Sequence, residues 1–158
     1  DATADAATYF NDTSPSATVF TVNTAHSVNA DGENYIAYCW REIDGYSKIG
    51  SYIGNSNVFG QFAYTGFRPA FVMFKRADGV EHWTIFDNKR DPQNIVGQRV
   101  HPSLINAETD GTGATAIIVD FTATGFKIRG TSANMNDDAD TYIFMAFAET
   151  PFKYANAR

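Results

Sequence analysis

The stretch FDNKRDPQN, residues 86–94, carries the densest set of ionisable side chains in the sequence. Two carboxylates, Asp87 and Asp91, lie four positions apart around a Lys-Arg pair. Paired carboxylates perform glycoside hydrolysis, one as acid and the other as nucleophile or base, when only a few ångströms separate them. A salt-bridged turn after a strand uses the same residues and needs no chemistry. We predict the turn and no enzymatic activity, and a glycan depolymerase is the alternative.

Histidine and cysteine are further side chains from which catalysis is built, and each needs a partner within hydrogen-bond reach. The histidines, His26, His82 and His101, are scattered, so we expect solvated or hydrogen-bonded rings. The single cysteine, Cys39, lies in an aromatic stretch and is predicted to be buried and unreactive. One cysteine also excludes an intrachain disulfide.

The stretch NMNDDAD, residues 134–140, places oxygen-bearing side chains at alternate positions. Such oxygens suit a hard cation, and the candidate ligands of a calcium ion are Asn134, Asn136, Asp138 and Asp140. The stretch lacks the glycine and the terminal glutamate of a known calcium loop. We therefore expect a solvated turn and no cofactor, with a calcium site as the alternative.

The stretch GYSKIGSYIGN, residues 45–55, has the composition of a sugar-binding loop. Exposed Tyr46 and Tyr52 would offer ring faces for stacking, and Asn55 would offer a fixed amide. The alternative is that both tyrosines cover the edge of the core. These three residues are the candidate ligand-binding site, with a glycan of a host surface as the ligand.

Short strands separated by turn residues are expected to position these loops. Val, Ile, Thr, Phe and Tyr are abundant and leucine occurs once, which favours strands over helices. The segment 102–109 could hold a short helical turn, with Leu104 and Ile105 facing inward. The predicted fold is an all-β, antiparallel two-sheet β-sandwich of the jelly-roll or concanavalin A-like type. The expected strands are 17–22, 34–43, 60–64, 69–76, 82–87, 115–121, 125–129 and 141–149.

Several of these strands are apolar on both faces. In FVMFK, Phe71 and Met73 alternate with Val72 and Phe74, and residues 142–149 follow the same pattern. Such a strand must be covered on both sides, either in the centre of a sandwich or against another chain. Copies of the chain itself are therefore expected partners.

The chain contains what resembles an internal repeat. YIAYCWRE at residues 35–42 returns as YIFMAFAE at 142–149, an offset of 107 positions. If the repeat is genuine, residues 44–158 form a complete β-sandwich unit. Residues 17–43 are then the tail of a preceding unit, packed on the main domain or on a neighbouring subunit. Residues 1–16 are expected to form an N-terminal arm or linker. Strands of this composition are common, so a chance match is the alternative.

The acidic character of the chain excludes a nucleic-acid partner. The net charge is −6 and the isoelectric point is about 4.9, and no more than two basic residues are consecutive. No apolar run is long enough for a membrane span, so membrane insertion is not expected. The sequence starts at Asp1 without a signal-peptide pattern, which favours a processed product or an excised fragment.

Five long stretches also carry a family resemblance: YIAYCWREIDGYSKIGSYIGN, FAYTGFRPAFVMFKR, WTIFDNKRDPQN, DFTATGFKIRG and TYIFMAFAETPFKYANAR. They resemble a domain near the C-terminus of large, tail-fibre-like virion structural proteins of tailed bacteriophages, especially marine ones. The resemblance covers residues 17–158. It implies a concanavalin-like sandwich on the virion surface, a structural or host-attachment role and trimeric assembly. It implies no catalytic residues, and the upstream half usual in that family is missing.

The expected function is that of a tail-fibre-like phage virion structural protein, outside the cell on the particle surface and binding the host cell surface. Its expected partners are copies of itself, as a homotrimer or a head-to-tail assembly, and other virion proteins. The alternative from another class is a self-assembling filament or capsid-decoration subunit without a ligand.

Overall fold

The computed structural model describes residues 7–111 and 116–151 and divides the chain into two compact units, Asp1–Trp40 and Arg41–Arg158. The units differ in charge. All twelve Lys and Arg residues follow Trp40, whereas five of the eighteen Asp and Glu residues precede Arg41. The first unit is therefore purely acidic and the second is close to neutral. The origin of residues 17–43 as the tail of a repeat stays a prediction.

The first unit holds two one-turn helices, α1 (Ala7–Phe10) and α2 (His26–Asn29), and no strand among its described residues. The strands predicted at 17–22 and 34–43 are therefore wrong. A strand needs a hydrogen-bonded neighbour, and most backbone hydrogen bonds of this unit close turns instead, as from Ser16 N–H to the Val19 carbonyl over 2.8 Å.

The aromatic stretch 35–40, predicted to be a two-faced strand, is exposed within this unit. Ile36 and Tyr38 expose 79% and 73% of their surface, and the Tyr38 and Trp40 rings stack with centroids 6.0 Å apart. Cys39 is exposed as well, so the prediction of a buried thiol is wrong. Alternating aromatic residues favour an extended backbone, but they do not supply the neighbouring strand that would bury them.

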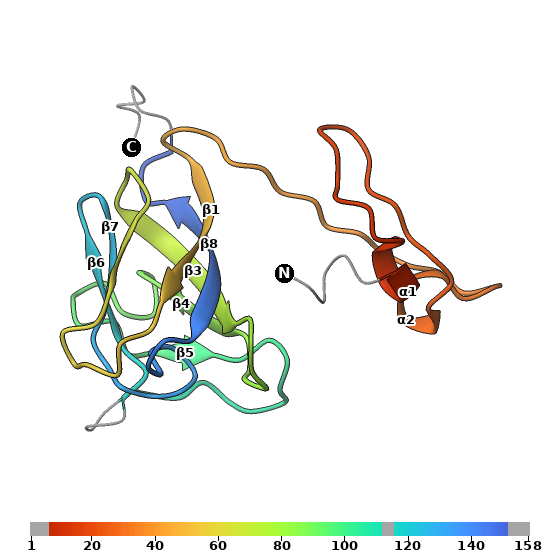
Figure 1. The fold of residues 1–158 in the computed structure, drawn as a ribbon. Helices are drawn as coiled ribbons and strands as arrows, with labels where there is room; N and C mark the ends of the chain where they lie inside the picture. Colours follow the sequence, from red (N-terminus) through yellow and green to blue (C-terminus); the bar gives the residue numbers. More distant parts are fainter. Residues whose placement is uncertain (1–6, 112–115, 152–158) are drawn as a thin grey trace. The chain divides into compact units, whose positions relative to one another are not determined.

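The second unit is a β-sandwich of two antiparallel sheets (Figure 1). The larger sheet has the order β1-β8-β3-β4-β5 and the smaller sheet has the order β2-β7-β6. This confirms the predicted all-β, two-sheet sandwich, whereas its jelly-roll or concanavalin A-like connectivity stays a prediction. The strands are β1 (Ser47–Ile53), β2 (Phe62–Tyr64), β3 (Pro69–Arg76), β4 (Thr84–Asp87), β5 (Arg99–Val100), β6 (Val119–Thr122), β7 (Gly125–Ile128) and β8 (Thr141–Ala148).

Aromatic side chains from both sheets fill the space between them. Phe74 of β3 and Phe144 of β8 are paired in register and buried, and Phe126 of β7 is completely buried opposite them. The Phe126 ring meets the Phe144 ring edge to face, with centroids 5.1 Å apart, and so joins the two sheets. Since β8 pairs with both β1 and β3, this two-faced strand is an interior strand of the larger sheet, next to the central strand β3.

The outer side of the larger sheet carries a row of apolar side chains. Ile49, Met145, Met73 and Ile85 are paired in register across four neighbouring strands. Ile49 is 39% exposed, and the other three are half-buried. We call these four residues the outer apolar row. The small sheet covers the inner face of β3 and β8, and within this unit the outer face is only partly covered.

The prediction misses β1 and β5. Serine, lysine and glycine interrupt the apolar alternation of β1, which makes this strand resemble a loop. The helical turn expected at 102–109 is wrong, because no helix forms there and Ile105 is fully exposed. No helix in the described part of the chain combines the length and the apolar character that crossing a membrane requires.

Candidate functional site

The loop between β7 and β8 contains the four predicted metal ligands, and one of them is a core residue. The side chain of Asn136 is completely buried. Its amide nitrogen donates to the carbonyl oxygens of Asn57 and Gly130, each over 2.8 Å. Its amide oxygen accepts from the backbone N–H of Asn55 over 2.9 Å. Asn136 therefore ties three backbone segments together and is turned away from solvent.

The other three predicted ligands do not converge with Asn136. Asn134 is half-buried, Asp138 is exposed, and Asp140 pairs with an arginine. Within residues 7–111 and 116–151, no three His, Cys, Asp or Glu side chains are grouped so that they could hold a metal ion. Calcium binding stays the untested alternative, and the structure places the proposed ligands in separate roles.

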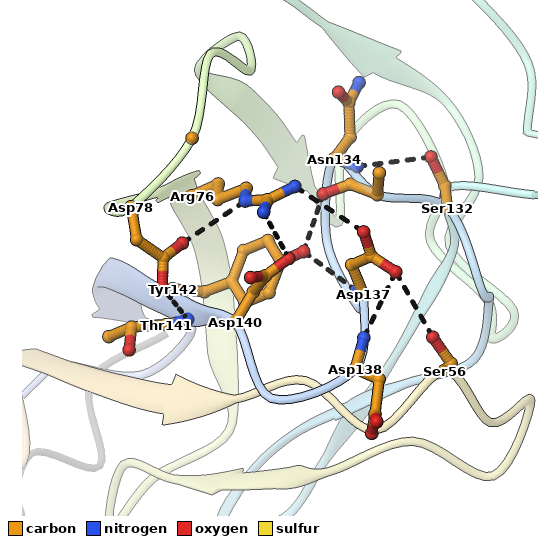
Figure 2. A network of polar contacts seen from close by, with 12 residues as sticks. Ser56, Arg76, Asp78, Ser132, Asn134, Asp137, Asp138, Asp140, Thr141 and Tyr142 are labelled. Carbon is orange, nitrogen blue, oxygen red and sulfur yellow. Dashed lines mark hydrogen bonds and ion pairs between the residues drawn. The ribbon is translucent and has the colours of Figure 1, made fainter.

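Arg76, the last residue of β3, is the cation that the carboxylates of this loop face (Figure 2). Its guanidinium lies 2.6 Å from Asp140, 3.2 Å from Asp78 and 3.6 Å from Asp137. Burial acts to lower the pKa of Arg76, but the hydrogen bond to Asp78 and the charge of Asp140 outweigh it and raise the pKa. The Thr141 N–H donates to Asp78 over 2.8 Å and lowers the pKa of that carboxyl. The network is an ionised clamp between β3 and β8.

The predicted sugar platform is not formed, because Tyr52 belongs to the core. Only 7% of Tyr52 is exposed, and its ring stacks on Tyr142 with centroids 5.1 Å apart. Its hydroxyl donates to the Met135 carbonyl over 2.8 Å, and the Tyr142 hydroxyl donates to the Ala133 carbonyl over 2.6 Å. Burial, with a smaller effect of Tyr142, raises the pKa of Tyr52 well above its usual value. The two phenols stay protonated and anchor the loop.

Tyr46 and Asn55, the other members of that candidate site, lie at opposite ends of β1. Tyr46 is half-buried and its ring packs edge-on against Phe147, with centroids 5.8 Å apart. Asn55 is half-buried, and its side-chain oxygen accepts from the backbone N–H of Asn57 over 3.1 Å. The structure therefore does not bring Tyr46, Tyr52 and Asn55 together.

Gly54 lets the loop between β7 and β8 approach the end of β1. Its N–H donates to the Asp140 carbonyl over 2.8 Å, and its carbonyl accepts from Ala139 N–H over 3.1 Å. A Cβ at position 54 would lie 2.0 Å from the Asp137 carbonyl oxygen. Only glycine fits this close backbone contact.

The candidate acid pair, Asp87 and Asp91, supports the turn in which it lies. One oxygen of Asp87 accepts from two backbone N–H groups of that turn, each over 2.9 Å, and the other pairs with Arg90 at 2.5 Å. One oxygen of Asp91 accepts from the N–H groups of Gly97 and Gln98, each over 2.8 Å. These are the bonds of a salt-bridged turn, and the depolymerase stays a hypothesis.

The histidines do not form a catalytic arrangement with these carboxylates. The ring of His101 lies with Nδ1 3.0 Å from the Trp83 carbonyl, to which it donates, and burial lowers its pKa. His82 is exposed, with its ring centroid 6.2 Å from that of His101, and His26 is exposed in α2. His101 is therefore hydrogen-bonded, as predicted.

Sequence reasoning missed the surface where aromatic side chains of the second unit are most exposed. Three aromatic residues and three charged residues gather on the outer side of the small sheet. The signal for it is the alternation in β2, in which Ala63 and not its aromatic neighbours is the core residue. We call the set the aromatic face, and its members are Phe59, Phe62, Tyr64, Asp120, Lys127 and Arg129.

Comparisons with known proteins identify the family. No curated protein and no solved structure matches the chain. A family model described as a domain of unknown function, DUF7483, matches residues 1–151, which span the first unit and most of the second. The chain therefore belongs to the DUF7483 family.

Proposed function

We propose that the chain is a non-enzymatic, tail-fibre-like module of a tailed-bacteriophage virion, exposed on the particle and binding the host cell surface. The resemblance of residues 17–158 to virion structural proteins supports this setting. The roles of the ionisable side chains support a structural module: the Arg76 clamp joins two strands, and Asp87 and Asp91 stabilise a turn. A jelly-roll or concanavalin A-like sandwich would hold the shape of such a module.

The observation that carries the proposal is the outward placement of large aromatic side chains in both units. Tyr38 and Trp40 in the first unit expose 73% and 52% of their surface, and Phe59 and Tyr64 in the second expose 67% and 64%. Exposed aromatic clusters mark interaction surfaces, because isolated monomers rarely leave them in water. Both units therefore expose aromatic surfaces that suit binding to a partner.

Adhesion of the purified chain to bacterial cells tests this function. We expect a fluorescently labelled chain to bind a subset of isolates saturably, with unlabelled chain competing. Antibodies raised against the chain are expected to label tailed particles in lysates of the same isolates by immunogold electron microscopy. No saturable adhesion across the panel and no labelled particles would together refute the proposal.

A self-assembling subunit is the second candidate, and the outer apolar row favours it. A second copy lying across this row would remove Ile49 and its three neighbours from water. Mass photometry is expected to show an oligomer that Ile49→Lys dissociates, while Val80→Lys, at a fully exposed position elsewhere, leaves it intact. A wild-type chain that stays monomeric at micromolar concentration would eliminate this candidate.

A further inference from the structure

The aromatic face gathers the most exposed aromatic side chains of the second unit in one place. Phe59, Phe62 and Tyr64 are the most exposed Phe, Tyr and Trp side chains in the described part of this unit. All three lie within six consecutive positions, Phe59 in the segment before β2 and the other two in the strand. Scattered exposed apolar residues are ordinary, but a cluster of this kind marks a binding surface.

The small sheet fixes how these rings are arranged. Phe62 is opposite Lys127, which is opposite Asp120, and Tyr64 is opposite Gly125. Since Phe62 and Tyr64 are two positions apart on one strand, they lie on the same side about 7 Å from each other. A Cβ at Gly125 would lie 2.8 Å from Cζ of Phe62, so that ring leans across the neighbouring strand. The rings of Phe62 and Tyr64 therefore lie next to each other on one side of the sheet.

Charged side chains of the two neighbouring strands border the rings. The Arg129 guanidinium lies 5.5 Å from the centroid of the Phe59 ring and 3.4 Å from the Asp120 carboxylate. Lys127 makes no ion pair with any described residue. The aromatic face thus has two cations against one carboxylate, in a chain whose net charge is −6. This local excess of positive charge fits an anionic ligand.

The mixture of rings and charges also restricts the class of ligand. The centre of a protein–protein interface is depleted of Lys and Asp, yet Lys127 lies opposite Phe62 and Asp120 lies opposite Lys127 on the same side of the sheet. A sugar ring has C–H faces that stack on aromatic rings and a rim of hydroxyls that bonds to charged side chains. A chain of such sugar rings could stack on the aromatic side chains while its polar groups reach the charged side chains that border them.

We infer that the aromatic face binds an extended anionic glycan, with Phe62 and Tyr64 stacking on sugar rings and Lys127 pairing with a carboxylate. The inference rests on the proposed function, since it names the ligand through which the chain would hold the host surface. It also moves the glycan site from Tyr46, Tyr52 and Asn55 to the outer side of the small sheet.

Titration of the full chain with three polyuronates, alginate, polygalacturonate and hyaluronate, tests the inference, with dextran as a neutral glucan. We expect saturable binding to at least one polyuronate and at least tenfold weaker binding to dextran. Phe62→Ala and Tyr64→Ala should each weaken binding about five- to tenfold. Lys127→Gln should weaken it about threefold at low salt and less at high salt.

Matched control variants distinguish the loss of a contact with the glycan from the loss of the folded structure. Ile105→Ala removes a fully exposed apolar side chain that is not part of the aromatic face and should leave binding unchanged. Lys127→Glu keeps all three rings and reverses one charge, so it tests the anionic preference even if an aromatic variant unfolds. The thermal unfolding midpoint of each variant shows which of them retain the fold.

Three results would overturn the inference: no saturable binding to any polyuronate, equal binding to dextran, or full binding by both Phe62→Ala and Tyr64→Ala. Adhesion to cells distinguishes this failure from that of the proposed function. If cells still bind the chain and protease treatment of the cells abolishes binding, the partner is a protein, and only the glycan inference fails. If no cells bind the chain, the proposed function fails as well.

Discussion

Replacing Asn136 with alanine should destabilise the second unit much more than the same change at Asn134. Asn136 is completely buried and its amide makes three hydrogen bonds to the backbone, to Asn55, Asn57 and Gly130. The substitution leaves two carbonyl oxygens and one N–H without these partners. Asn134 is half-buried and its amide makes none of these bonds, which makes it the matched control.

The loss of unfolding free energy depends on how well water can reach the backbone groups that lose their hydrogen-bond partner. The bond to the Gly130 carbonyl is buried, and loss of such a partner costs about 2 kcal/mol. The bonds to Asn55 and Asn57 are partly buried, so water can replace some of each, and they cost about 1 kcal/mol apiece. The sum is about 4 kcal/mol, a large share of the 5–15 kcal/mol that typically stabilises a domain. For a unit of this size it lowers the melting temperature by roughly 15 °C.

Urea unfolding followed by tryptophan fluorescence measures this effect. Trp83 reports the second unit alone in a Trp40→Phe background, because these are the two tryptophans of the chain. We expect Asn136→Ala to lower the free energy of unfolding by about 4 kcal/mol and Asn134→Ala by less than about 0.5 kcal/mol. Asn136→Asp should be worse than alanine, because a carboxylate would face two carbonyl oxygens. A loss below about 1 kcal/mol in Asn136→Ala would refute the reasoning.

Three further predictions concern other parts of the chain. Burial lowers the pKa of His101, so its ring binds a proton more readily in the unfolded chain than in the folded one. The free energy of unfolding should therefore fall as the pH drops below about 6.5. The urea midpoint should fall less over the same pH range in His101→Gln. Gly54→Ala should cost about 2 kcal/mol in thermal unfolding, because the new methyl group would lie against the Asp137 carbonyl; an unchanged midpoint would contradict this close contact. Cys39 should react with a thiol reagent in the native chain nearly as fast as in urea, and strong protection would show that it is covered.

Sequence patterns predicted the strands whose apolar alternation is uninterrupted. β3 and β8 carry bulky apolar residues on both faces, and their bounds agree with the predicted ones within one residue. β1 was missed because its inward positions hold Gly50 and its apolar residues are separated by serine. Glycine leaves room there for the Phe144 ring, since a Cβ at position 50 would lie 2.9 Å from it. Packing against a distant strand thus favours glycine at this position, and glycine makes the local sequence resemble a loop.

The candidate site could not be predicted residue by residue, because burial depends on the other elements. Asn134 and Asn136 share a type and an alternate spacing, yet only Asn136 lies under the two backbone segments that it bonds, at Asn55–Asn57 and at Gly130. Tyr46 and Tyr52 differ in the same way, because Tyr52 faces the inner side of β1 beside Tyr142. The exposure of Phe62 and Tyr64 depends on Ala63 being the inward residue of a three-residue strand, and so short a strand has too few positions to show it.

The uneven charge of the two units has a practical consequence for proteolysis. Trypsin cuts after Lys and Arg, and the first such residue is Arg41, which is exposed and directly follows the boundary between the units. No tryptic site exists within residues 1–40. Brief digestion of the native chain should therefore release residues 1–41 as one fragment, and the remaining sandwich can be isolated without designing a truncation.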